Sequence, residues 1–185
     1  MNGRELLIGV SGGIAAFKSA QLVSQLVQAG ARVSVVMTRA AEQFVAPTTF
    51  QALSGRAVAR TLFDPVGYPL GAHIELAERG ELLCIAPATA NLLAKAATGL
   101  ADDLLSTLIL SFRGPIVMAP AMNSDMWGKP AVVRNVERLK SDGLHIVGPE
   151  PGWLSCRKTG PGRMADPETI QAAIAELLAS CDTND

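Results

Sequence analysis

The sequence is poor in aromatic and charged residues. Aromatics make up 4% of its 185 residues and Asp, Glu, Lys and Arg 18%, with 16 basic and 17 acidic side chains for a formal charge of −1. A nearly neutral chain without a basic cluster does not attract nucleic acid or an anionic membrane, so neither is expected as a partner. No apolar run reaches the roughly 18 residues of a membrane span, and the N-terminus lacks a signal-peptide pattern, so we expect a cytoplasmic protein.

Cysteine is also scarce. Cys84, Cys156 and Cys181 are odd in number and lack metal-ligand spacing, which predicts neither a disulfide framework nor a metal site. Residues of the hydrophobic class make up 49% of the chain, mostly as small and aliphatic side chains, and this excludes a disordered chain. We expect part of this apolar surface to be covered by another subunit.

Short apolar runs alternate with helical patterns, which is typical of a parallel sheet covered by helices on both faces. The sequence predicts an α/β fold with a doubly wound parallel sheet, in a single domain over residues 1–181 with a frayed tail at 182–185. The predicted strands are 6–10, 32–37, 82–86, 115–119 and 144–147. The predicted helices are 15–30, 73–79, 89–97, 102–112, 130–141 and 166–180. Pro87 is expected to end the third strand, and residues 148–164, called the flap below, are expected to form a long loop.

The turn after the first strand is rich in glycine and reads Gly9-Val10-Ser11-Gly12-Gly13-Ile14-Ala15. Glycines let a backbone approach a ligand closely, and a helix N-terminus favours a phosphate. The turn is not the G-x-G-x-x-G fingerprint, and the second strand ends at Thr38-Arg39 without the acidic residue that holds a dinucleotide's ribose. A mononucleotide such as FMN therefore fits better than a nicotinamide cofactor or FAD, and a tight turn without ligand is the alternative.

Four further segments carry polar or reactive side chains where a predicted strand ends or a loop begins. Residues 86–91 offer Thr89 or Asn91 beside the sheet edge, although ordinary helix capping also explains them. Residues 119–127 could line a pocket, although Met and Trp are more often core residues. His73 could act as a base near neutral pH or be structural. Cys156 has basic neighbours that would favour a thiolate.

Taken together, these segments resemble the homo-oligomeric flavin-containing cysteine decarboxylases from about residue 6 to 170. The most specific element is Pro120-Ala121-Met122-Asn123-Ser124-Asp125-Met126-Trp127, which matches the family pattern Pro-x-Met-Asn-x-x-Met-Trp. The glycine turn, the His-Ile-x-Leu segment from His73, the Ala-Pro-Ala-Thr-Ala-Asn stretch and the Cys-x-x-x-Gly-x-Gly-Arg-Met flap accompany it in order. The resemblance implies a Rossmann/flavodoxin-like fold of three layers.

The resemblance also implies residue roles. The FMN contacts would be Ser11, Gly12, Gly13, Ile14, Thr38, Thr89, Ala90, Asn91 and Ala121. Asn123 would bind the substrate carboxylate. The other substrate contacts would be Met126, Trp153, Leu154 and Ser155. His73 would be the active-site base, and Cys156 would donate a proton late in the cycle.

The family's chemistry implies a cysteinyl carboxylate substrate, foremost 4′-phosphopantothenoylcysteine of coenzyme A biosynthesis, which would give 4′-phosphopantetheine. FMN oxidises the thiol to a thioaldehyde that accepts the electrons released with CO2, and the resulting enethiol is then reduced. The family builds its FMN site between subunits of a trimer, sometimes grouped into a dodecamer, and 185 residues leave no room for the ligase domain of many bacterial relatives.

Two residues depart from the family pattern. Arg157 follows the flap cysteine where glycine is frequent, and Glu78 stands where a basic residue often binds the substrate phosphate. The alternatives are therefore a decarboxylase of another cysteinyl substrate, such as a peptide ending in cysteine, and a non-catalytic FMN-binding regulatory subunit.

Overall fold

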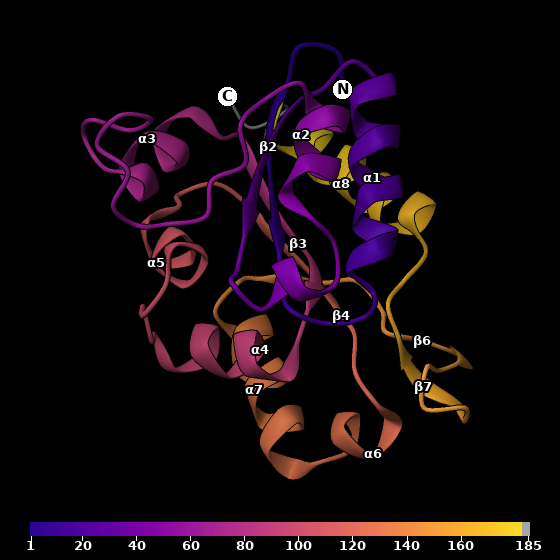
Figure 1. The fold of residues 1–185 in the computed structure, drawn as a ribbon. Helices are drawn as coiled ribbons and strands as arrows, with labels where there is room; N and C mark the ends of the chain where they lie inside the picture. The colour runs from indigo at the N-terminus through magenta and orange to yellow at the C-terminus, as the bar shows by residue number, and fades with distance from the viewer. Residues whose placement is uncertain (183–185) are drawn as a thin grey trace.

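The computed structural model describes residues 1–182 and is built on a five-stranded parallel sheet (Figure 1). The strands are β1 (Glu5–Val10), β2 (Arg32–Met37), β3 (Leu82–Ala88), β4 (Ile116–Pro120) and β5 (His145–Ile146). Their order in the sheet is β2-β1-β3-β4-β5. This order is that of flavodoxin-like folds, in which the chain reverses direction across the sheet between β1 and β3. The predicted doubly wound fold is confirmed.

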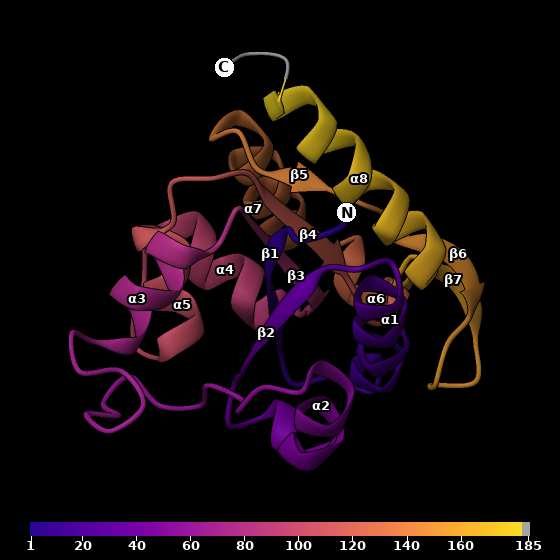
Figure 2. The same ribbon diagram turned by 90° about the horizontal axis from the view of Figure 1, so that it is seen from above.

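Helices cover both faces of the sheet and give three layers (Figure 2). One face packs against α1 (Ala16–Gln28), α2 (Pro47–Ser54) and α8 (Pro167–Asp182). The other face packs against α3 (Ala72–Arg79), α4 (Ala90–Thr98), α5 (Leu104–Ser111) and α7 (Pro130–Ser141). Two short helices, η1 (Ala41–Gln43) and α6 (Ser124–Trp127), complete the set between residues 1 and 182. Alternate strand residues supply the two cores: Leu6 and Ile8 lie in the first, and Leu7 lies in the second.

Three predictions about the ends and loops need revision. β3 continues through Pro87 to Ala88, because the ladder with β4 resumes at Ala88 and Pro120 after a register shift that accommodates the missing N–H. The flap is an antiparallel hairpin of β6 (Glu150–Trp153) and β7 (Thr159–Arg163) rather than an irregular loop. Of the predicted tail, residue 182 belongs to α8, and residues 183–185 lie outside the described residues.

No helix within residues 1–182 has the length and apolar character needed to cross a membrane. In the same part of the chain, no three His, Cys, Asp or Glu side chains gather in the manner of metal ligands.

Candidate functional site

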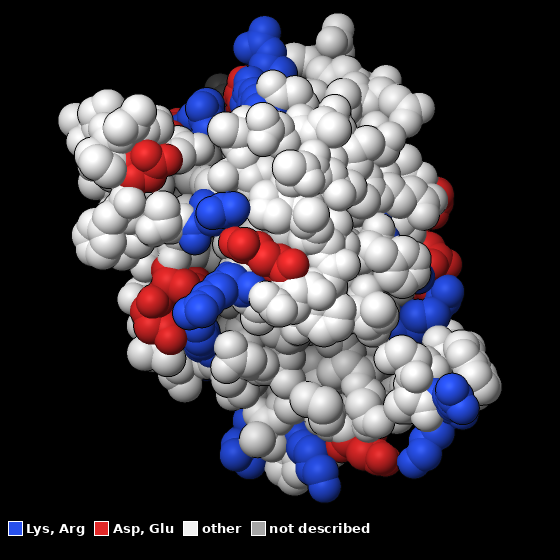
Figure 3. All heavy atoms as spheres, in the orientation of Figure 1, with Lys and Arg blue, Asp and Glu red and all other residues white. Residues whose placement is uncertain are grey.

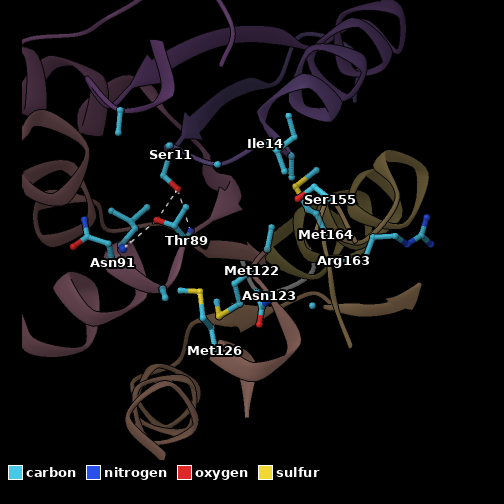
Figure 4. Close-up of a pocket in the computed structure, with 18 of the residues that line it drawn as sticks. Ser11, Ile14, Thr89, Asn91, Met122, Asn123, Met126, Ser155, Arg163 and Met164 are labelled. Atoms are coloured by element: carbon cyan, nitrogen blue, oxygen red, sulfur yellow. Dashed lines mark hydrogen bonds between the residues drawn. The ribbon is translucent and has the colours of Figure 1, made fainter. Parts of the chain in front are cut away.

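A cavity of about 920 Å³ opens at the carboxyl ends of the parallel strands. Its walls come from the segments that follow β1 to β4 and from the flap, which lies on one side (Figure 4). Open α/β sheets bind ligands at this edge, where the strand order reverses. The predicted site residues that line the cavity are Ser11, Gly12, Gly13, Ile14, Thr38, Thr89, Ala90, Asn91, Ala121, Asn123, Met126, Trp153, Leu154, Ser155 and Cys156. His73 is the predicted site residue that does not line it.

The glycine turn presents unpaired backbone donors to this cavity. Within residues 1–182, the N–H groups of Gly12, Ile14 and Ala15 donate no hydrogen bond, although they stand at the N-terminus of α1. The helix dipole adds positive potential at the same point. The turn therefore has the donors and the field that bind a phosphate.

Gly12 is required by a close approach between two loops. An ideal Cβ on Gly12 would lie 2.8 Å from the carbonyl carbon of Ala40 and would collide with the Ala40 Cβ. A side chain at position 12 would therefore separate the turn from the segment that follows β2.

The Ser11 hydroxyl joins the two loops at the strand-order reversal instead of pointing freely into the cavity. It donates to the Pro87 carbonyl oxygen at 2.7 Å and accepts from the Thr89 N–H at 3.1 Å. Figure 4 shows Ser11 and Thr89 in contact on one wall. Thr89, rather than Asn91, caps α4, since its hydroxyl oxygen accepts from the Leu92 N–H. Ser11 therefore holds the cavity wall in shape.

On another wall, the side-chain amide of Asn123 is oriented by its own backbone. Its Oδ1 accepts from the Asp125 N–H at 2.7 Å, and Asn123 caps α6. This leaves Nδ2 as the free donor, and it points to the Sγ of Cys156 at 3.5 Å. A carboxylate placed in the cavity would thus meet an amide donor and a thiol side by side.

The tip of the flap explains how Cys156 is presented. The Leu154 N–H donates to the Lys158 carbonyl oxygen, and the Arg157 N–H donates to the Leu154 carbonyl oxygen, both at 2.9 Å. These bonds define a three-residue hairpin loop, whose last position is left-handed. Arg157 has φ of 63°, a region that glycine adopts more readily. The turn keeps this shape with arginine in the place where the family often has glycine.

Cationic side chains outnumber carboxylates around the cavity. Lys18, Arg39, Lys95 and Arg163 line it with a single carboxylate, Asp103. Burial raises the pKa of Asp103, but hydrogen bonds from Lys95 and Ser106 outweigh burial and hold the pKa below its ordinary value. Within the described chain, Arg39 is the cavity-lining cation without a carboxylate partner. The charge balance suits an anionic ligand.

Comparison with known proteins agrees with this geometry. The model of the family described as Flavoprotein matches residues 1–179. The chain belongs to the flavoprotein family. Two relatives of this flavoprotein are the coenzyme A biosynthesis bifunctional proteins CoaBC of Vibrio vulnificus and Escherichia coli, which are 45% and 46% identical over 95% and 91% of the chain. The matches cover only 44% and 41% of those relatives, so the flavoprotein spans less than half of their length.

Solved structures show the same fold. The FMN-dependent cysteine decarboxylase SpaF superposes with a TM-score of 0.81 at 36% identity, covering 96% of each chain. A PPC decarboxylase mutant complexed with pantothenoylaminoethenethiol superposes with a TM-score of 0.85 at 29% identity, covering 96% of this flavoprotein and all of that chain.

His73 of the flavoprotein stands apart from the cavity. It lies in the first turn of α3, where its backbone carbonyl accepts from the Ser111 hydroxyl at 3.4 Å. Its Nδ1 is buried and has no hydrogen-bond partner within residues 1–182. Exposed apolar side chains surround this end of α3 and α5: Leu70 is 73% exposed, Ile74 40% and Leu110 56%. A single subunit therefore does not bring the predicted base to the predicted amide and thiol.

Several lining residues were missed from the sequence. Lys18 in the first turn of α1 follows Ile14 of the glycine turn by four residues, and this spacing could have placed both side chains on the same side of the cavity. Lys95 and Asp103 gave no such signal, because their proximity depends on how α4 packs against α5. Trp127 packs against the second core and does not line the cavity, so the core interpretation holds for it.

Proposed function

We propose that the chain is an FMN-dependent decarboxylase that converts 4′-phosphopantothenoylcysteine to 4′-phosphopantetheine. The observation that carries this proposal is the contact between Asn123 and Cys156 in a cavity that also contains the phosphate-binding turn. An amide donor can bind the cysteinyl carboxylate, and a thiol can donate a proton. The names of the relatives, which include CoaBC and PPC decarboxylase, support the same activity.

Two parts of the cavity suit FMN: the glycine turn suits its phosphate, and a wall with polar side chains suits its ribityl chain. The unpaired N–H groups of Gly12, Ile14 and Ala15 would hold its phosphate. Thr38 and Asn91 would face its polar side chain, since both line the cavity near this turn. FMN supplies, when bound, the two-electron acceptor and donor that lets a cysteinyl group lose CO2 without net oxidation.

The residues around the substrate would bind its carboxylate, supply a proton and exclude water. Asn123 Nδ2 would hold the carboxylate until CO2 leaves, and its fixed Oδ1 limits how far the amide can rotate. Cys156 would give a proton to the enethiol from the flap side. Met126 and Leu154 would exclude water from the same space.

A second subunit would complete the site by supplying His73. The apolar surface beside His73 and the exposed Ile14 and Phe17 at the cavity are different surfaces of one chain. When two different surfaces of identical chains meet, the contact is head-to-tail, and it forms a closed ring when the rotation between neighbouring subunits is a whole fraction of a turn. The broad area without charged side chains in Figure 3 is consistent with burial in such an assembly. We therefore propose a homotrimer, or a homododecamer built from such trimers, in which His73 of one subunit faces the cavity of the next.

The experiment that tests the proposal compares three substrates with the FMN-loaded protein: 4′-phosphopantothenoylcysteine, its dephosphorylated form and a peptide ending in cysteine. We expect the phosphorylated substrate to have the highest kcat/KM, because Arg39, the lining cation without a carboxylate partner within the described chain, favours an anion. Preference for the peptide would assign the alternative substrate, and absence of CO2 with all three would indicate the non-catalytic regulatory subunit.

A further inference from the structure

The flap hairpin has little apolar anchorage of its own, because Met164, the flap residue that belongs to a core, follows the end of β7. A two-stranded hairpin alone is at best marginally stable in water. Leu154 is buried, but Trp153 in β6 is 65% exposed, and neither belongs to the two cores of the sheet. Polar contacts must therefore hold the flap, and Cys156 with it, over the cavity.

The second strand of the flap, β7, contacts the segment after β4 that carries Asn123. The Met122 N–H donates to the Gly162 carbonyl oxygen at 2.9 Å. Gly162 has φ of +130°, and a Cβ there would collide with the Met122 carbonyl oxygen. This contact fixes the height of β7 above Asn123. The other polar link to α6, the ion pair of Lys158 with Asp125 at 3.8 Å, is exposed and adds little to it.

A cluster of charged side chains closes the base of the flap; we call Lys18, Glu150, Arg163 and Asp166 the flap anchor. Arg163, at the end of β7, donates to Glu150 at the start of β6 at 2.6 Å, and it reaches both carboxylate oxygens of Asp166, at 3.2 and 3.1 Å. Lys18 on α1 donates to Asp166 Oδ1 at 2.8 Å. Figure 4 shows the Arg163 side chain directed away from the centre of the cavity.

Asp166 is the junction of the flap anchor. Its carboxylate joins the flap, through Arg163, to the helix whose N-terminus forms the phosphate-binding turn, through Lys18. The Lys18 side chain is 17% exposed and the Asp166 side chain 43%, so water and salt screen this ion pair in part, from the Asp166 side.

We propose that Asp166 is a positioning residue: through Lys18 and Arg163 it holds the flap closed and places Cys156 beside Asn123. The role in the reaction rests on the proposed decarboxylase function, but the role in holding the flap does not. Without the Asp166 charge, the flap opens more frequently and Cys156 spends less time within reach of the substrate.

The variant Asp166→Asn isolates this role. Asparagine is as good a residue as aspartate before a helix, so α8 keeps its start while the ion pairs with Lys18 and Arg163 are lost. Lys18→Met removes the same contact from the other side. Asp142→Asn is the matched control, because it breaks the exposed pair with Arg138 on α7, far from the flap.

Trypsin reports flap opening without relying on catalysis. The flap tip carries the cleavage sites Arg157 and Lys158, and Arg60 in the segment before α3 is an internal reference. Cleavage of a briefly opened segment follows the population of its open form. Loss of a charge-assisted hydrogen bond, discounted for partial exposure, should raise cleavage at the tip about tenfold relative to Arg60 in Asp166→Asn and Lys18→Met. The double variant should be at most slightly faster than Asp166→Asn, because the Lys18–Asp166 pair is lost in all three and only the long bond from Lys18 to the Met164 carbonyl oxygen, at 3.5 Å, is lost in addition.

The inference is overturned if Asp166→Asn is cleaved at the tip like Asp142→Asn, or if the two single effects simply add. The second readout is the product mixture from 4′-phosphopantothenoylcysteine, in which Asp166→Asn should leave a larger fraction as unreduced enethiol. A faster cleavage with an unchanged product mixture would refute the placement of Cys156. If the unaltered protein forms no product, the proposed function fails, while the trypsin comparison still decides whether the flap anchor exists.

Discussion

Replacing Gly12 with alanine tests the phosphate-binding turn. The new Cβ would lie 2.8 Å from the Ala40 carbonyl carbon and 3.0 Å from its oxygen, so the two loops must separate by roughly 0.5–1 Å to reach ordinary contact at about 3.5 Å. Such overpacking costs about 1–3 kcal/mol when it is not relieved. The free chain relieves it by moving the turn, and FMN binding must then restore the original position. FMN affinity should therefore fall by about 5- to 150-fold, the equivalent of that energy.

Quenching of FMN fluorescence on titration with the protein measures this affinity. The matched control is Gly128→Ala, whose Cβ would have only an ordinary contact, 3.7 Å to the Ser124 carbonyl oxygen, and whose affinity should not change. The double variant Gly12→Ala/Ala40→Gly removes one of the colliding atoms and should recover part of the affinity. If Gly12→Ala binds FMN as tightly as the unaltered chain, the turn does not hold the phosphate.

Three further predictions concern the flap, the cavity wall and the base. Arg157→Gly removes the strain of a left-handed φ at a residue with a side chain, so hydrogen exchange of the flap amides should slow about threefold to fivefold. Faster exchange would show that Arg157 is not strained. Asp103→Asn should lower the free energy of unfolding by about 1–2 kcal/mol at neutral pH. Because the folded-state pKa of Asp103 is depressed, this difference in the free energy of unfolding is fully present above about pH 4 and should shrink as the pH falls further. Urea unfolding at several pH values measures it, and a difference that does not change with pH would contradict the prediction. The variants His73→Asn and Asn123→Asp should each be inactive alone but should regain decarboxylation when their subunits are mixed and assemble together. If activity does not return, both residues belong to the site of one subunit.

The sheet and its helices were largely predictable because buried parallel strands and amphipathic helices leave clear periodicity. β2 and α7 begin and end where the apolar pattern does. The flap hairpin was not predictable in this way, because Thr159–Arg163 contains two glycines and a proline and buries little apolar surface. Backbone hydrogen bonds and the flap anchor, rather than periodicity, determine its form.

The site was predictable where its residues follow strands in sequence. The glycine turn, Thr89 and Asn123 each come after a strand that ends at the same edge, so the parallel sheet brings them together. His73 shows the limit of this reasoning, because one chain does not carry it to the cavity. The role of Asp166 depends on a side-chain contact with Lys18 across 148 residues, for which the sequence has no local signal.

The most direct test of the proposed activity uses 4′-phosphopantothenoylcysteine labelled with ¹³C in its carboxyl group and the FMN-loaded protein without air. We expect one ¹³CO2 for each phosphopantetheine formed, over many turnovers, with no net loss of oxidised flavin. Absence of ¹³CO2, or release that stops after one turnover with the flavin left reduced, would contradict the account.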